Sequence, residues 1–123
     1  MIDGFVHVQA AVEGPLRELK NARLLLDTGT RNTILDIETA EEAGYPASCG
    51  LGVARFRSIA GEEVGYTVRL PSLTALGRKV DDYLVACTDL KGELNIDGIL
   101  GLDFFQNADL TVGLRSQHLE LAW

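Results

Sequence analysis

The stretch LLLDTGTRNTIL, residues 24–35, decides how this sequence is interpreted. Three leucines predict a buried strand, and that strand ends on the carboxylate of Asp27. A charge at the edge of a core requires either a partner or a function. Gly29 permits a tight turn, while Thr28 and Thr30 supply hydroxyl groups that can orient the carboxylate. The tripeptide Asp-Thr-Gly by itself is common in ordinary turns, so its meaning depends on the rest of the chain.

The composition is that of a folded, acidic domain. The 123 residues suit one domain, which we expect to span residues 1–123, and an apolar content of 46% is sufficient for a core. The net charge of -7 argues against a nucleic-acid partner, because such a partner requires a basic face. Cys49 and Cys87 lack the spacing of metal ligands, and we expect two reduced thiols without a disulfide.

The sequence contains neither an apparent secretory signal nor a membrane span. Its start, MIDGFVHVQ, has no basic segment followed by a long apolar run. No apolar stretch approaches the ~18–20 residues that a bilayer-spanning helix requires. We therefore expect no membrane contact within this chain and a cytoplasmic location, with membrane anchoring only if the chain is a fragment of a longer protein.

Apolar residues alternate with polar ones along most of the chain, and this period of two predicts strands. Strands are expected over residues 5–12, 21–26 and 33–36, followed by a helix in IETAEEAGY (37–45) that ends at Gly44. Two hairpins are predicted next, with turns near Gly61 and Gly77, then a short helix after Gly101 and a last hairpin. This mostly β pattern with two short helices favours a closed or partly closed β-barrel.

Three segments, in this order, resemble the retropepsin-like aspartic proteases: LLLDTGTRNTIL (24–35), FRSIAGEEVGY (56–66), and DGILGLDFF (97–105) with the DLTV that follows it. The resemblance extends from Phe5 to Leu121. It implies a single-domain closed β-barrel with a flap hairpin and a psi-loop. In that arrangement the short helix spans 102–108, and three residues pack behind the active-site loop: Ile99, Leu100 and Gly101.

The resemblance also implies an aspartic endopeptidase that acts on a peptide or protein substrate. Hydrolysis by this route needs two carboxylates that share a water, one ionised and acting as base, the other protonated and acting as acid. The chain has a single Asp-Thr-Gly. The second carboxylate is therefore expected from Asp27 of another copy in a homodimer, as in the short members of the family. No cofactor and no metal are expected.

Each matching residue takes its expected role from this resemblance. Asp27 would be the catalytic residue, supported by its loop neighbours. The hydroxyl of Thr28 would cross to the partner's loop, the carbonyl of Gly29 would face the substrate backbone, and the hydroxyl of Thr30 can donate to Asp27. The flap residues that would cover the substrate are Ile59, Ala60 and Gly61.

The sequence departs from the viral members at two positions. Those enzymes usually carry an acidic residue at the position of Arg31 and an arginine at the position of Leu102, and the two form an ion pair. A reversed pair between Arg31 and Asp103 is one alternative, although Asp103 is predicted mainly as a charge at a helix N-terminus and Asp97 as a turn residue.

A second interpretation of the function stays open. The chain can also be a retropepsin-fold module that binds a peptide or protein without cleaving it, because a fold does not fix a function. The intact Asp-Thr-Gly favours the enzyme, since a binding module has little need for a costly pair of carboxylates on a two-fold axis. His7 and His118 stand alone in the sequence and are expected to be solvated.

Overall fold

The computed structural model describes residues 6–27, 29–58, 61–90, 96–106, 109–113 and 118–122. Within these ranges only the backbone is described for residues 56–58, 61–63, 109–113 and 118–122.

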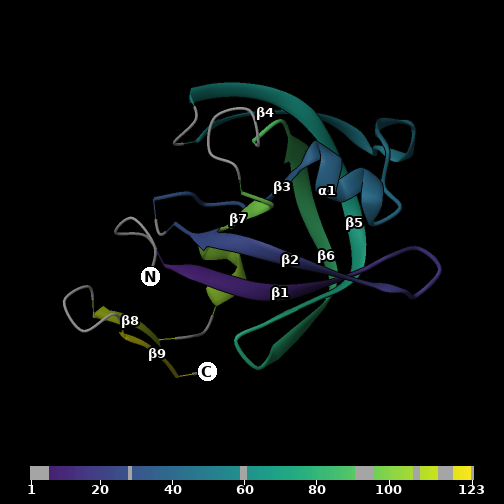
Figure 1. Ribbon diagram of the computed structural model, residues 1–123. Helices are drawn as coiled ribbons and strands as arrows, with labels where there is room; N and C mark the ends of the chain where they lie inside the picture. The colour runs from purple at the N-terminus through teal and green to yellow at the C-terminus, as the bar shows by residue number, and fades with distance from the viewer. Residues whose placement is uncertain are drawn as a thin grey trace.

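Six strands close into a barrel, as the alternating pattern predicts (Figure 1). Hydrogen-bonded neighbours run in the order β1, β2, β7, β3, β6, β5, and β5 returns to β1 where Leu73–Ala75 pair with Ala10–Val12. The sheet is mixed, because the β2–β7 and β3–β6 pairs are parallel and the others antiparallel. The bounds of the six strands are β1 (His7–Glu13), β2 (Leu19–Leu26), β3 (Ile34–Asp36), β5 (Gly61–Ala75), β6 (Arg78–Thr88) and β7 (Gly98–Leu100).

The long strand β5 is shared by the two predicted hairpins. Its first half pairs with β4 (Gly52–Ser58), which lies outside the barrel, and most of its length pairs with β6. Figure 1 shows β5 curving around one side of the molecule. The turn between β5 and β6 contains Leu76 and Gly77, both with positive φ angles, as the prediction of a turn at Gly77 requires.

Three short helical segments connect the strands. The helix α1 (Ile37–Glu42) begins after Asp36, whose carboxylate accepts hydrogen bonds from the main-chain N–H groups of Glu38 and Thr39. It ends before Gly44, which has a φ of 106°. The other two segments are 3₁₀ turns, η1 (Ala47–Cys49) and η2 (Leu102–Phe105), so the predicted helix after Gly101 is present as a single tight turn.

Apolar side chains form two clusters on opposite sides of the sheet. The larger one fills the barrel and includes Leu24, Leu35, Leu70 and Phe104. The smaller one, here called the outer apolar cluster, lies on the other side and comprises Leu25, Ile34, Ala54, Ala86, Leu90, Ile96 and Ile99. Because side chains alternate along a strand, the side chain of Asp27 points to the same face of the sheet as that of Leu25, two residues earlier. The carboxylate therefore lies on the side of the outer apolar cluster.

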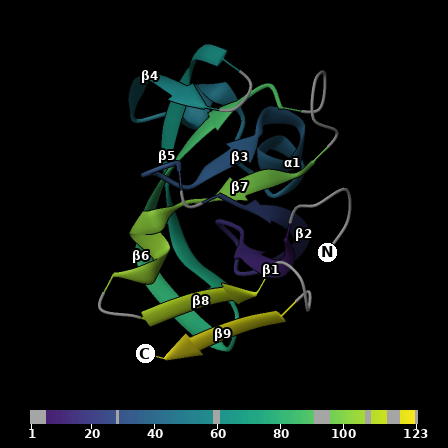
Figure 2. The ribbon, with the colours of Figure 1, turned by 90° about the vertical axis from the view of Figure 1, so that its left-hand side faces the viewer.

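The last hairpin is formed by β8 (Asp109–Gly113) and β9 (His118–Ala122), in agreement with the prediction. These two strands make a separate sheet that is not hydrogen-bonded to the described strands of the barrel. Figures 1 and 2 show the hairpin at one end of the molecule, beyond β1.

Within the described residues, no helix combines the length and the apolar character needed to cross a membrane.

Both cysteines are free thiols, as predicted, but their surroundings differ. Cys49 is exposed, whereas Cys87 is buried in the barrel. Burial, with a smaller contribution from the Asp36 carboxylate, raises the pKa of the Cys87 thiol to about 12. Since the thiolate is the reactive form, Cys87 is protected both by inaccessibility and by protonation.

We predict that iodoacetamide at about pH 8 modifies one thiol in the native protein and both in urea. Mass spectrometry of peptides would assign the native modification to Cys49, and Cys49→Ser should abolish it. Equal rates of modification at Cys49 and Cys87 in the native protein would contradict the buried position of Cys87.

Candidate active site

Asp27 lies immediately after β2, half-buried, at the start of the loop that leads to β3. One carboxylate oxygen accepts a hydrogen bond from the N–H of Gly29 at 2.9 Å. The other accepts from the hydroxyl of Thr30 at 2.7 Å, so the bond expected from Thr30 is present. The N–H of Thr30 donates in turn to the carbonyl of Asp27 at 3.2 Å. Two donors on two oxygens fix the orientation of the carboxylate.

The strand β7 holds this loop from behind, in the psi-loop arrangement that the resemblance implies. It lies between β2, to which it is parallel, and β3, to which it is antiparallel. Ile99 and Leu100 are fully buried within it. The carbonyl of Leu100 accepts a hydrogen bond from the N–H of Asp27 at 3.2 Å. The catalytic candidate is thus attached through its main chain to the centre of the sheet.

The 3₁₀ turn η2 holds the other half of the loop. The N–H groups of Leu102 and Asp103 donate to the carbonyls of Thr30 and Arg31, both at 2.9 Å. Gly101 makes this approach possible, because a Cβ atom there would lie 2.7 Å from the carbonyl of Asn32 and 2.9 Å from that of Thr30. No larger residue fits this position without moving the loop.

Asp103 has a larger role than the sequence predicts. It does lie in the first turn of η2, but its carboxylate accepts from the N–H of Thr33 at 3.2 Å, the hydroxyl of Thr33 at 2.9 Å and the hydroxyl of Tyr83 at 2.6 Å. The alternative of a reversed ion pair with Arg31 is not present among the described residues, where the Asp103 carboxylate binds Thr33 and Tyr83 instead. Asp97, predicted as a turn residue, also accepts from the N–H of Arg23 at 2.9 Å.

Sequence reasoning missed Thr33 and Tyr83. Thr33 is fully buried, and its hydroxyl oxygen accepts from the N–H of Gly101 at 3.0 Å. Tyr83 lies on β6, on the side that faces the barrel interior. The available signal was weak: a threonine at the end of a polar loop and a tyrosine at an interior position of an alternating strand.

Some of the predicted site residues lie outside the described part of the chain. These are Thr28 in the loop and Ile59 and Ala60 at the flap tip. The strands of the hairpin expected to form the flap are present, because β4 and β5 are paired from Gly52 and Thr67 to Ser58 and Gly61. Gly61 is the first residue of β5.

A groove of about 300 Å³ lies beside the loop. It extends from the loop to β4, β5 and β6. Two of the residues that line it, Ala54 and Ala86, also belong to the outer apolar cluster. Val53 and Leu84 expose apolar surface there. The remaining lining residues are Asn32, Arg55, Thr67 and Val85. This mixture of apolar walls and a few polar groups suits a segment of peptide.

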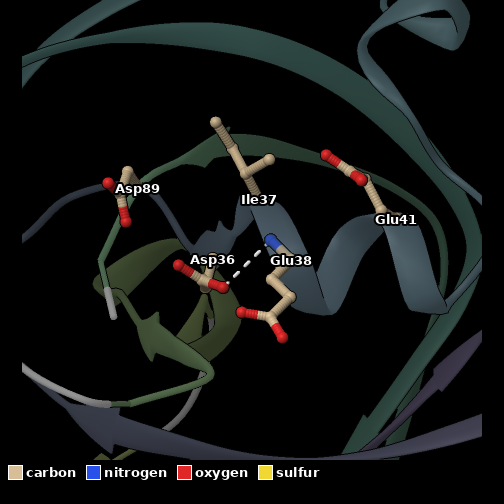
Figure 3. Close-up of a pocket in the computed structure, with 5 residues that line it drawn as sticks. All are labelled: Asp36, Ile37, Glu38, Glu41 and Asp89. Atoms are coloured by element: carbon tan, nitrogen blue, oxygen red, sulfur yellow. Dashed lines mark hydrogen bonds between the residues drawn. The ribbon is translucent and has the colours of Figure 1, made fainter. Parts of the chain in front are cut away.

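A second hollow, of about 350 Å³, lies at the start of α1 (Figure 3). Its lining is acidic: Asp36, Glu38, Glu41 and Asp89, with Ile37. Asp36 already serves as the helix cap and also accepts from the N–H of Leu90 at 2.9 Å, which accounts for its burial. Among the described residues, no three His, Cys, Asp or Glu side chains are grouped so that they could hold a metal ion.

Comparison with known families decides the assignment. The family model described as "Aspartyl protease" matches residues 8–104, which is most of the chain. This chain belongs to the aspartyl protease family. The matched segment contains the Asp27 loop, the β4–β5 hairpin, β7 and most of η2. None of the curated protein sequences is significantly similar to it.

Solved structures show the same retropepsin-like fold. A retropepsin-like aspartic protease from Rickettsia conorii is similar with a TM-score of 0.73 and 18% identity, covering 98% of this chain and 92% of its own. EIAV protease, in complex with the inhibitor HBY-793, is similar with a TM-score of 0.63 and 15% identity, and the match covers 86% of this chain and 89% of the EIAV protease chain. The retroviral protease-like domain of Ddi1 from Leishmania major is similar with a TM-score of 0.62 and 17% identity, and the match covers 95% of this chain and 87% of the Ddi1 domain.

The contact at Gly101 predicts that Gly101→Ala lowers the free energy of unfolding by about 1–3 kcal/mol, because the added methyl group pushes against the main chain of the loop. Gly52→Ala is the matched control. A Cβ atom at Gly52 would have only the Thr67 hydroxyl oxygen nearby, at 3.9 Å. The substitution should therefore leave the free energy of unfolding unchanged or raise it slightly. Urea unfolding of both variants measures the difference. Equal stability of the two would show that the loop does not lie against Gly101.

Proposed function

We propose that this protein is a homodimeric aspartic endopeptidase whose single domain spans residues 1–123. It would hydrolyse peptide bonds with a water activated between two Asp27 carboxylates, one from each subunit. The observation that carries the proposal is the Asp27 loop. Its carboxylate is oriented by Gly29 and Thr30, and its main-chain N–H is bound to β7, in a chain of the aspartyl protease family.

The proposed chemistry needs no cofactor and forms no covalent intermediate. Two carboxylates in close contact cannot both ionise readily, so the pair retains one proton. The ionised carboxylate takes a proton from the water as the water oxygen attacks the carbonyl carbon. The protonated carboxyl group donates to the carbonyl oxygen. The tetrahedral diol then collapses: the carboxyl group that took the water proton gives it to the leaving nitrogen as the C–N bond breaks, and a diol hydroxyl returns a proton to the other carboxylate.

Two observations support the homodimer. The described carboxylates near the loop are occupied elsewhere, because Asp97 and Asp103 both accept main-chain and hydroxyl hydrogen bonds away from Asp27. In addition, β8 and β9 form a two-stranded sheet with no partner strand in the described barrel. An isolated hairpin of this kind is only marginally stable, and its edges are pairing sites. We propose that the chain ends, including Leu119–Trp123, meet those of the partner subunit.

The groove beside the loop supports a peptide as substrate. It begins at Asn32, five positions after Asp27, and continues along β4 and β6. The fold is that of EIAV protease, which was solved with an inhibitor bound. We propose that an extended peptide lies across the loop under the hairpin tip, Ile59, Ala60 and Gly61, with one flank in the groove. Thr28 would contact the partner's loop.

Asp27→Asn is predicted to abolish peptide cleavage, by at least about a thousandfold, while the fold and the dimer remain. The amide cannot accept a proton from water, but it preserves the shape of the carboxylate. Asp82→Asn is a suitable control, because Asp82 is an exposed residue of β6 with a positive φ angle, and its carboxylate is paired with Arg69 far from the loop. Cleavage of a peptide library, followed by mass spectrometry, measures both. A pure Asp27→Asn protein with full activity would exclude the proposed mechanism, and a folded wild-type dimer that never cleaves would favour a binding module.

Mixing the two proteins tests whether the site is shared. If a site needs Asp27 from both subunits, then Asp27→Asn chains in about ninefold excess should lower the activity of wild-type chains about tenfold after subunit exchange. Most wild-type chains would then be paired with an inactive partner. The same excess of Asp27→Asn should have no effect if each chain acts alone, and that result would contradict the dimeric site.

A further inference from the structure

The hydroxyl of Tyr83 joins three segments of the chain at one point. Tyr83 lies on β6 and is 8% exposed. Its oxygen is 2.6 Å from a carboxylate oxygen of Asp103, at the start of η2. It is also 2.7 Å from the hydroxyl oxygen of Thr33, at the end of the Asp27 loop. Tyr83 therefore links a long strand of the barrel to η2 and to the end of the loop itself.

The hydrogen bonds have a defined direction. The carboxylate of Asp103 only accepts, so the hydroxyl groups of Tyr83 and Thr33 both donate to it. The oxygen of Thr33 accepts from the N–H of Gly101 at 3.0 Å. Burial, and then the bond to Asp103, raises the pKa of Tyr83 well above its ordinary value, so the tyrosine stays protonated and keeps donating.

A continuous path leads from Tyr83 to the catalytic candidate. Asp103 fixes η2, and the N–H groups of η2 hold the carbonyls of Thr30 and Arg31 at 2.9 Å. The hydroxyl of Thr30 then holds the carboxylate of Asp27 at 2.7 Å. Each step is a hydrogen bond of ordinary length, and the partially buried setting strengthens it relative to water.

We propose that Tyr83 is a positioning residue for Asp27, and that Thr33 and Asp103 transmit its effect. This inference rests on the proposed peptidase function for its kinetic consequence, but the positioning itself can be measured without activity. Tyr83 does not contact the substrate or the water. It keeps the carboxylate in the orientation in which it acts.

Tyr66 provides a matched control. It is also 8% exposed and also faces the barrel interior, and its hydroxyl donates to the carbonyl of Tyr45 at 2.7 Å. Tyr66→Phe and Tyr83→Phe each delete one buried hydroxyl from a similar position. Only Tyr83→Phe deletes a hydroxyl group that contacts Thr33 and Asp103, the residues that hold the Asp27 loop.

The experiment compares wild type, Tyr83→Phe and Tyr66→Phe by urea unfolding, by amide hydrogen exchange and by steady-state kinetics on a cleaved peptide. We expect both variants to lose similar stability. Tyr83→Phe alone should speed exchange at the amides of Thr33, Leu102 and Asp103 by about tenfold. It should lower kcat by about tenfold and leave KM nearly unchanged, because the defect lies in orientation.

Thr33→Val and Thr33→Ser separate positioning from packing. Thr33→Val keeps the shape but removes the hydroxyl, and it should behave as Tyr83→Phe does. Thr33→Ser keeps the hydroxyl and should retain the wild-type kcat and exchange pattern. The proposal is overturned if exchange at these amides is unchanged in Tyr83→Phe, or if both tyrosine variants change kcat equally. A wild-type protein without peptidase activity would refute the proposed function, while the exchange measurements would still decide the role of Tyr83.

Discussion

The hydrogen bond from the N–H of Asp27 to the carbonyl of Leu100 is the contact on which the rest of the site depends. It exists because β7, only three residues long, is inserted between β2 and β3. β7 is far from both strands in the sequence, so the site forms only when the barrel closes. The same insertion brings Gly101 and η2 against the loop, where their N–H groups bind its carbonyls. A charged residue can end a buried strand here because the surrounding backbone groups have partners.

Four aspartates lie at or beside the ends of strands and helical segments, and each accepts hydrogen bonds from main-chain N–H groups. Asp36 caps α1 and binds the N–H of Leu90, and Asp97 binds that of Arg23. Asp103 binds Thr33, and Asp27 binds Gly29. Part of the net charge of -7 is therefore structural. Asp27 differs from the others in its position. It lies on the side of the outer apolar cluster, near the groove that is lined by Asn32 and by residues of β4, β5 and β6.

Local patterns in the sequence were sufficient to predict much of the fold. Alternating apolar residues predicted the strands. The psi-loop was expected from the family resemblance that the Asp-Thr-Gly turn and the later Ile99–Gly101 segment carry. Three features depended on tertiary closure and could not be predicted. A single β5 serves two hairpins because it must span the barrel. Thr33, Tyr83 and Asp103 meet only when β6 and η2 are packed together, since 50 and 20 positions separate Tyr83 from the other two. The role of the β8–β9 hairpin depends on its neighbours in space, and sequence alone does not supply them.

The distance between the two Asp27 carboxylates, measured in a crystal structure of the protein, tests the central claim most directly. We expect a dimer in which these groups approach within hydrogen-bonding distance, roughly 2.6–3.2 Å, across a two-fold axis. We also expect a water molecule bound by both carboxylates on the side that faces the substrate. A monomer, or a dimer in which the two Asp27 residues face away from each other, would contradict it.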